Sequence, residues 1–164
     1  MQLFKDEGYT YISGDQIHRE RTEVLLADDL KQYLYSRYAK DGITPSEVDS
    51  IILMLRNTSG TLYETNKSIY KMLCDGFIFN REDRTQKDIF VELIDFDSPE
   101  NNIFKAVNQF EIVGVHNQMR IPDGIVFING IPVVVLEFKS AVKENTTIMD
   151  AYTQITVRYL RDIP

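Results

Sequence analysis

The first half of the chain carries apolar residues at helical spacing. An apolar stripe predicts a helix over residues 17–39, which Asp41-Gly42 would end. Thr44-Pro45-Ser46-Glu47 has the form of a capping box with proline at the first helical position, so a second helix is expected to begin there. A third helix is expected over residues 62–75, with Gly76 as its C-terminal stop.

The hydrophobic period changes after Gly76. Apolar and polar residues then alternate in short runs, which is typical of strands. The predicted strands are residues 89–96, residues 109–115, and two more within residues 124–138 around Asn129-Gly130. Residues 146–162 return to helical spacing and predict a closing helix.

This order of elements predicts an α/β fold, a mixed β-sheet flanked by helices with an N-terminal helical region. The length of 164 residues is that of a single domain. We expect a mainly helical part over about residues 1–76 and a sheet core with its closing helix over residues 77–164.

The net charge, the lengths of the apolar runs and the cysteine count limit the classes of protein to which this chain could belong. The net charge of −7 argues against a domain that grips nucleic acid through bulk charge, but it does not exclude a nuclease, whose site needs carboxylates. No apolar run approaches the roughly 18 residues of a membrane span. The N-terminus does not have the pattern of a secretory signal, and the single cysteine, Cys74, suits a reducing cytoplasm.

Three charged residues flank the apolar hairpin of residues 121–139. Glu137 and Lys139 are two apart on one strand and leave the same face, whereas the face of Asp123 depends on the turn. A plain two-residue turn at Asn129-Gly130 would set Asp123 opposite Leu136 and point it away from Glu137. One extra residue, in the loop or as a β-bulge, would set Asp123 opposite Glu137. We predict such an extra residue.

Two carboxylates on one face make a poor ion pair but suitable ligands for Mg²⁺, and a neighbouring lysine can orient water or stabilise charge on a phosphate. The alternative is that Asp123, Glu137 and Lys139 are the solvated ends of an ordinary hairpin. The apolar run Val133-Val134-Val135-Leu136 favours the first interpretation, because it suggests a central strand rather than an exposed edge.

Pro122-Asp123 followed by Glu137-Phe138-Lys139 resembles the PD-(D/E)xK nuclease signature. Residues 120–141 as a whole, "RIPDGIVFINGIPVVVLEFKSA", resemble the N-terminal nuclease domain of type I restriction enzyme R subunits. Further stretches resemble the same family, so that the likeness covers nearly the whole chain: "GYTYI" (8–12), "ERTEVLLADDL" (20–30), "ETNKSIYKMLCDGF" (64–77) and "VELIDFDSPENNIFKAVNQFEIV" (91–113).

The resemblance implies a restriction-endonuclease-like fold and Mg²⁺-dependent endonucleolytic hydrolysis of double-stranded DNA. Asp123, Glu137 and the backbone carbonyl of Phe138 would bind the metal, and Lys139 would serve the attacking water. In the family, cleavage follows ATP-driven translocation in a complex with modification (methyltransferase) and specificity subunits. No G-x-x-x-x-G-K-[ST] loop is present, so ATP is not expected to bind here, and the chain is interpreted as a fragment that lacks the motor domains.

The family commonly carries Gln-xxx-Tyr on the helix after the lysine, and this chain departs from that spacing. Gln154 is followed by Tyr159 five residues later, one residue more than the family pattern. On a regular α-helix Arg158 rather than Tyr159 would lie over Gln154, unless a π-bulge absorbs the extra residue. Gln154 is therefore predicted as a site residue, and the role of Tyr159 is left open.

Other polar residues have competing interpretations. A further metal carboxylate could come from Glu20, Glu23 or Glu64, but solvated helix faces explain these residues better. His18, His116 and Cys74 are not expected to form a zinc or catalytic site, and Cys74 is interpreted as a core residue. Arg120 could contact a phosphate or pair with a nearby acid.

Two rival functions remain beside the restriction nuclease. The first is another PD-(D/E)xK enzyme of DNA repair or junction resolution, which would share the three charged residues but not the N-terminal sequence stretches. The second is a non-catalytic assembly module that keeps the fold, against which the intact acid, acid-x-lysine pattern argues.

Overall fold

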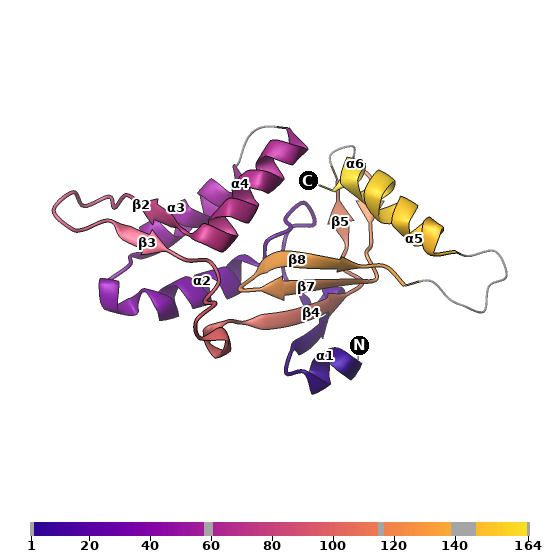
Figure 1. Cartoon of the computed structure of the whole chain (residues 1–164), viewed down its shortest axis with the longest axis horizontal. Helices are drawn as coiled ribbons and strands as arrows, with labels where there is room; N and C mark the ends of the chain where they lie inside the picture. The colour runs from indigo at the N-terminus through magenta and orange to yellow at the C-terminus, as the bar shows by residue number, and fades with distance from the viewer. Residues whose placement is uncertain (1, 58–60, 115–116, 139–146, 164) are drawn as a thin grey trace. The chain divides into compact units, whose positions relative to one another are not determined.

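The computed structural model describes residues 2–57, 61–114, 117–138 and 147–163 (Figure 1). It contains two compact units. The first unit combines Met1–Leu26 with Phe104–Pro164, and the second is Ala27–Ile103. The chain therefore leaves the first unit, builds the second and returns. The expected single domain, with its division near residue 76, stays a prediction.

The first unit is built on a four-stranded mixed sheet in the order β1-β4-β7-β8. Strand β1 pairs in parallel with β4, and the other two pairings are antiparallel. The predicted mixed α/β architecture is confirmed. The elements of this unit are α1 (Gln2–Asp6), β1 (Thr10–Ser13), η1 (Gly14–Gln16), β4 (Phe104–Asn108), β5 (Ile112–Val113), β6 (Met119–Arg120), β7 (Gly124–Ile128), β8 (Ile131–Leu136), α5 (Ile148–Thr153), η4 (Gln154–Tyr159) and α6 (Leu160–Asp162).

A buried apolar cluster supports this sheet. Phe127 on β7 packs against Phe110, with ring centroids 5.4 Å apart. Both side chains are fully buried, so they supply much of the apolar surface removed from water. The buried members of the cluster are Leu26, Val107, Phe110, Ile112, Ile125 and Phe127. The core therefore lies under the strands that lead to the predicted site.

The hairpin of β7 and β8 contains the predicted extra residue. Asn129 and Gly130 both have positive φ, 51° and 79°, as a two-residue hairpin turn of the primed type requires. Ile128 pairs with Ile131, but the register shifts by one beyond Phe127, so that Gly124 pairs with Leu136. A β-bulge at Val133 causes this shift, because Val133 has no partner in the ladder. The predicted extra residue is therefore confirmed, and it is a β-bulge rather than a longer loop.

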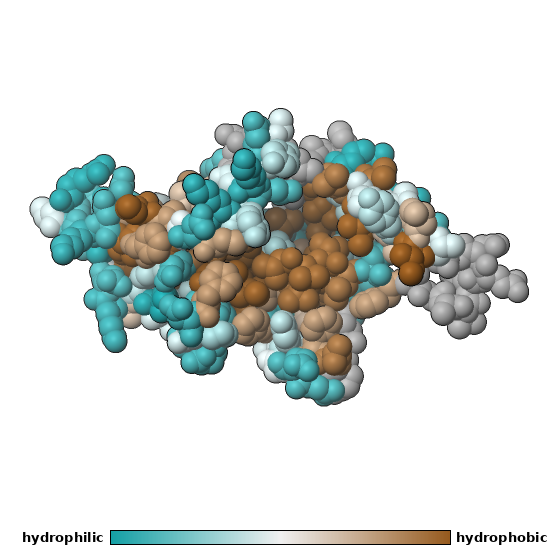
Figure 2. All heavy atoms as spheres, in the orientation of Figure 1, coloured by the Kyte–Doolittle hydropathy of each residue, from teal (hydrophilic) through white to brown (hydrophobic). Residues whose placement is uncertain are grey.

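The expectation that Val133–Leu136 forms a central strand is wrong. Among the described strands, β8 lies at the end of the sheet and pairs with β7 alone. Val133, Val134 and Val135 are 37%, 45% and 39% exposed. Figure 2 shows apolar side chains gathered over this strand. An apolar run signals a strand, but it does not specify that the strand has two neighbours.

The predicted helix over residues 17–39 is only half correct. Helix α2 covers Ala27–Arg37, whereas residues 17–26 are irregular. Arg19 holds this irregular segment, since its guanidinium donates to the backbone carbonyls of Glu20 and Glu23 at 3.0 and 2.7 Å. Leu26 joins the core of the first unit. Tertiary burial has therefore overridden the helical spacing of the sequence.

The second unit is mainly helical, and the predicted start of α3 and both predicted ends of α4 are confirmed. Thr44 and Thr61 each complete a capping box, with Glu47 and Glu64 respectively. Gly76 ends the third predicted helix with a φ of 66°. The elements are α2 (Ala27–Arg37), η2 (Ala39–Asp41), α3 (Pro45–Arg56), α4 (Leu62–Asp75), β2 (Phe77–Phe79), β3 (Ile89–Val91) and η3 (Pro99–Asn101).

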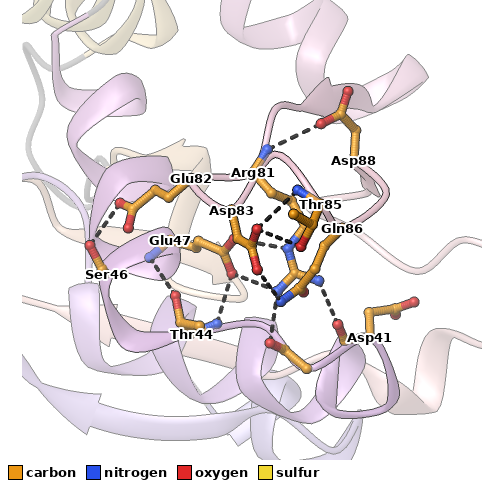
Figure 3. A network of polar contacts seen from close by, with 11 residues as sticks. Asp41, Thr44, Ser46, Glu47, Arg81, Glu82, Asp83, Thr85, Gln86 and Asp88 are labelled. Atoms are coloured by element: carbon orange, nitrogen blue, oxygen red, sulfur yellow. Dashed lines mark hydrogen bonds and ion pairs between the residues drawn. The ribbon is translucent and has the colours of Figure 1, made fainter.

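A buried ion pair fixes the loop between β2 and β3 to the start of α3 (Figure 3). Arg81 donates to both carboxylate oxygens of Glu47, at 2.9 and 3.0 Å, and to the carbonyl of Asp41 at 2.7 Å. Glu47 also accepts from the backbone of Thr44 as part of its capping box. Because a buried carboxylate is costly without a partner, the loop is held closely to the helix.

The strand predictions succeeded only in part. Strand β3 ends at Val91, well before the predicted end at residue 96, and Asp95 is instead held by Asn102, whose side chain accepts from the backbone of Asp95 at 2.8 Å. The predicted strand over residues 109–115 reduces to β5. Gln109, with a φ of 51°, separates β5 from β4, and β4 is a strand that the sequence pattern missed.

Within the described residues, no helix combines the length and apolar character needed to cross a membrane.

Candidate metal and nuclease site

Asp123 and Glu137 lie at the open end of the hairpin, one residue beyond the last paired positions of β7 and β8. Since Gly124 pairs with Leu136, continuing the register by one residue sets Asp123 opposite Glu137. A hydrogen bond shows how close the two strands are here: the backbone N–H of Phe138 donates to Oδ2 of Asp123 at 2.7 Å. Both acids are half-buried. The hairpin register thus agrees with the predicted extra residue, and the pairing of the two carboxylates at a metal stays a prediction.

Tyr159 contacts Glu137 from the closing helix. Its hydroxyl donates to Oε2 of Glu137 at 3.0 Å and accepts from the side-chain amide of Gln154 at 2.7 Å. The carbonyl of Ile121 lies 3.5 Å from the same hydroxyl. Gln154, Tyr159 and Glu137 therefore form one hydrogen-bonded chain that ends on a predicted metal ligand.

A π-helical segment brings Gln154 and Tyr159 together. The closing helix is α-helical in α5 and α6, but Gln154–Tyr159 forms a π-helix. A π-helix completes its turn with one residue more than an α-helix, so residues at i and i+5 share a face. The extra residue between Gln154 and Tyr159 is absorbed in this way. Tyr159, whose role the spacing left open, lies over Gln154.

The Tyr159 hydroxyl is protonated at neutral pH, as a tyrosine ordinarily is, and its burial reinforces this state. The side chain is only 6% exposed, and burial together with the adjacent Glu137 carboxylate raises its pKa to about 12, although the hydrogen bond from Gln154 acts in the opposite direction. At neutral pH the hydroxyl is therefore a hydrogen-bond donor. It can orient the Glu137 carboxylate without adding charge to the site.

The residues present fit a Mg²⁺ ion with an incomplete protein shell. Asp123 and Glu137 would supply carboxylate oxygens, and an ionised carboxylate has several acceptor positions on its two oxygens. The Phe138 carbonyl comes from the residue whose N–H is bound to Asp123. Within the described part of the chain, no group of three or more His, Cys, Asp or Glu side chains is arranged to hold a metal. Mg²⁺ commonly binds through one or two carboxylates and completes its shell with water and phosphate oxygens.

Lys139, the third predicted catalytic residue, lies outside the described residues. Its role therefore stays a prediction. The structure does bring together the other three predicted side chains, since Glu137 is linked to Gln154 through Tyr159, and Asp123 lies opposite Glu137 in the hairpin register.

Arg120, which could have contacted a phosphate, pairs with an acid. Its guanidinium donates to Asp162 of α6 through Nε at 2.9 Å and through Nη2. Asp162 has no exposed surface and also accepts from Arg161 at 2.7 Å. These hydrogen bonds from Arg161 and Arg120 hold the pKa of Asp162 well below its usual range. The sequence analysis missed Asp162, although its place three residues after Tyr159, on the same face of a helix, was a usable signal.

The remaining candidates have structural roles or remain predictions. Glu64 accepts from the backbone of Thr61 at 2.9 Å and caps α4. Glu20 and Glu23 precede α2 in the irregular segment, so they do not lie on a helix. Cys74 is exposed, and its interpretation as a core residue is wrong.

The fold and this end of the hairpin define a class: an α/β protein whose mixed sheet presents two opposed carboxylates beside a buried tyrosine. Comparison with known proteins makes the class specific. The family model "Type I restriction enzyme R protein N terminus" matches residues 1–163. The chain belongs to this family, as its resemblance in the sequence predicted.

Two relatives are endonuclease subunits of type I restriction enzymes. The MjaIXP subunit of Methanocaldococcus jannaschii is 33% identical over 174 residues, covering 100% of this chain and 16% of the relative. The HindI subunit of Haemophilus influenzae is 39% identical over 111 residues, covering 66% of this chain and 10% of the relative. The chain thus spans a small part of the length of either relative.

Proposed function

We propose that this chain is the Mg²⁺-dependent DNA-cleaving domain of a type I restriction enzyme and hydrolyses phosphodiester bonds of double-stranded DNA. The observation that carries this proposal is the bulge at Val133, which aligns Asp123 with Glu137 on one face. A hairpin with no catalytic task needs no such alignment of two like charges. Family membership over residues 1–163 favours this function over that of a repair or junction nuclease.

Each residue has a proposed task. Asp123, Glu137 and the Phe138 carbonyl would hold the metal, which would supply Lewis-acid polarisation of the phosphate and activation of water. The N–H of Phe138 fixes the Asp123 carboxylate, and Tyr159 with Gln154 fixes that of Glu137. Lys139 orients the attacking water or stabilises the negative charge that builds on the phosphate.

The proposed partners explain how an acidic domain handles DNA. With a net charge of −7, the chain does not attract the DNA backbone through its overall charge. We propose that motor domains powered by ATP, together with modification and specificity subunits, hold and select the DNA. The domain then contributes only the chemical step, in the cytoplasm where these partners act.

The decisive experiment uses the full-length subunit in its complex with modification and specificity subunits. Asp123→Ala, Glu137→Ala and Lys139→Ala should each abolish cleavage of plasmid DNA while ATP hydrolysis and translocation continue. The Lys40→Ala variant, at an exposed position of η2, serves as a control that should still cleave. Cleavage that survives in Asp123→Ala or Glu137→Ala would refute the nuclease assignment and support an assembly role.

A further inference from the structure

A second connection joins the two sides of the candidate site, away from the metal ligands. Arg120 on β6 and Asp162 on α6 form an ion pair in which Asp162 is completely buried and Arg120 is 24% exposed. Arg120 lies three residues before Asp123, and Asp162 lies three residues after Tyr159. The pair therefore couples the segment that leads into one carboxylate to the helix that contacts the other.

The backbone around the pair is closely packed. A Cβ atom added to Gly114 would lie 1.6 Å from the carbonyl oxygen of Asp162, so only glycine allows this approach. The N–H of Gly114 donates to the carbonyl of Gln118 at 2.9 Å, and the side chain of Gln118 accepts from Arg120 at 2.6 Å. The end of α6 is thus seated against the segment that precedes Asp123, with little freedom to shift.

At the start of the closing helix, the described residues are far more exposed than those at its C-terminal end. Ile148 and Met149, at the start of α5, are 89% and 66% exposed. At the other end, Ile163 packs against the core of the first unit, and its N–H donates to the carbonyl of Tyr159 at 2.8 Å. The position of the Tyr159 hydroxyl is therefore set mainly from the C-terminal end, where Asp162 is anchored by Arg120.

We infer that Arg120 and Asp162 are positioning residues of the proposed nuclease site. They hold the closing helix so that the Tyr159 hydroxyl reaches Glu137, and they act on metal binding through Tyr159 alone. Neither residue touches the metal or the substrate in this role. The inference rests on the proposed function, since it requires that Asp123 and Glu137 bind a divalent cation.

Arg161 provides a matched control. It pairs with the same carboxylate, through Nε at 2.7 Å, but its side chain is 58% exposed and it belongs to the same helix as Asp162. Removing Arg161 takes one partner from Asp162 without cutting the connection to β6. Removing Arg120 also takes one partner from Asp162, but in addition it breaks the link between α6 and β6.

The test measures Mn²⁺ binding to the 164-residue chain by electron paramagnetic resonance of the free ion. Arg120→Ala should weaken binding by about tenfold, as is usual when the support of a metal ligand is lost. Arg161→Ala should stay within roughly twofold of the wild type, as expected for an exposed ion pair. Equal losses in Arg120→Ala and Arg161→Ala would overturn the inference.

A double-mutant cycle separates positioning from general stability. In the Tyr159→Phe background, Arg120→Ala should weaken Mn²⁺ binding by no more than about twofold further. The reason is that Arg120 acts on metal binding through the Tyr159 hydroxyl, which this background already lacks. The same loss in both backgrounds would overturn the inference. If Arg120→Ala fails to fold by circular dichroism, Arg120→Lys replaces it, since lysine keeps the charge but not the planar fork. Wild-type affinity in Arg120→Lys would then overturn the inference.

Failure of the proposed function gives a different result. Wild-type chain that binds no Mn²⁺, or binding that persists in Asp123→Asn and Glu137→Gln, would refute the metal site itself and the inference with it. Binding that needs both acids but is insensitive to Arg120 would refute the inference alone.

Discussion

The hydroxyl of Tyr159 donates a 3.0 Å hydrogen bond to Oε2 of Glu137. A buried residue of the closing helix thereby orients a carboxylate at the end of an edge strand. This contact depends on two departures from regular structure: the bulge at Val133 and the π-helix that begins at Gln154. Both departures are frequent near functional sites, and each can be tested by changing the length of the chain by one residue.

Replacing Tyr159 with phenylalanine should weaken Mn²⁺ binding by about tenfold, because Glu137 loses the donor that fixes its carboxylate. The ring remains to fill the core, so the melting temperature should change little. Tyr152→Phe, at a 61% exposed position of the same helix, is the matched control and should bind Mn²⁺ normally. Isothermal titration calorimetry measures both variants. Equal affinities in the two variants would show that the hydroxyl does not support the site.

Deleting Val157 should convert the π-helical segment into a regular α-helix. Gln154 and the tyrosine would then be four residues apart and still share a face, as in the family pattern. Mn²⁺ affinity should therefore stay within about threefold of the wild type, a small effect beside the losses typical of a missing supporting residue. Inserting an alanine after Val157 should instead separate the pair. A deletion variant that binds as poorly as Tyr159→Phe would contradict this explanation of the π-helix.

The bulge predicts opposite results for a deletion and an insertion in β8. Deleting Val133 removes the unpaired residue and leaves Asp123 opposite Glu137, so Mn²⁺ binding should survive. Inserting one valine after Val134 slips the register by one and turns Glu137 to the other face, so binding should be lost. Circular dichroism checks that both variants fold. Equal binding in the two variants would show that register does not control the site.

The low pKa of Asp162 predicts an acid-sensitive contribution to stability. Because folding lowers this pKa, the ionised carboxylate stabilises the fold above its ordinary unfolded value, about 3.9, and this stabilisation is lost as pH falls below it. Asp162→Asn should lower the urea midpoint at neutral pH. The midpoint of the variant should also fall less between about pH 5 and 2 than that of the wild type. Parallel pH curves for the two proteins would contradict this.

The local sequence was informative wherever a short-range rule applied. The capping boxes at Thr44 and Thr61 and the glycine stop at Gly76 lie where their sequence patterns predict, because each depends on backbone groups within a few residues. The Asn129-Gly130 turn is equally local. The irregular segment around Arg19 could not be predicted, since Arg19 also donates to the carbonyl of Glu111 and lies over the ring of Phe110, both far along the chain.

The sequence by itself determined the α/β class, the hairpin and the identity of its two acids, because these follow from hydrophobic period, turn chemistry and residue type. Only the tertiary structure decided three further points: a bulge rather than a longer loop sets the register, β8 lies at the edge of the described sheet, and a π-helix brings Tyr159 to Glu137. The physical reason is the same in each case. One residue of backbone length shifts a side chain from one face to another, and packing against distant elements determines where that residue is accommodated.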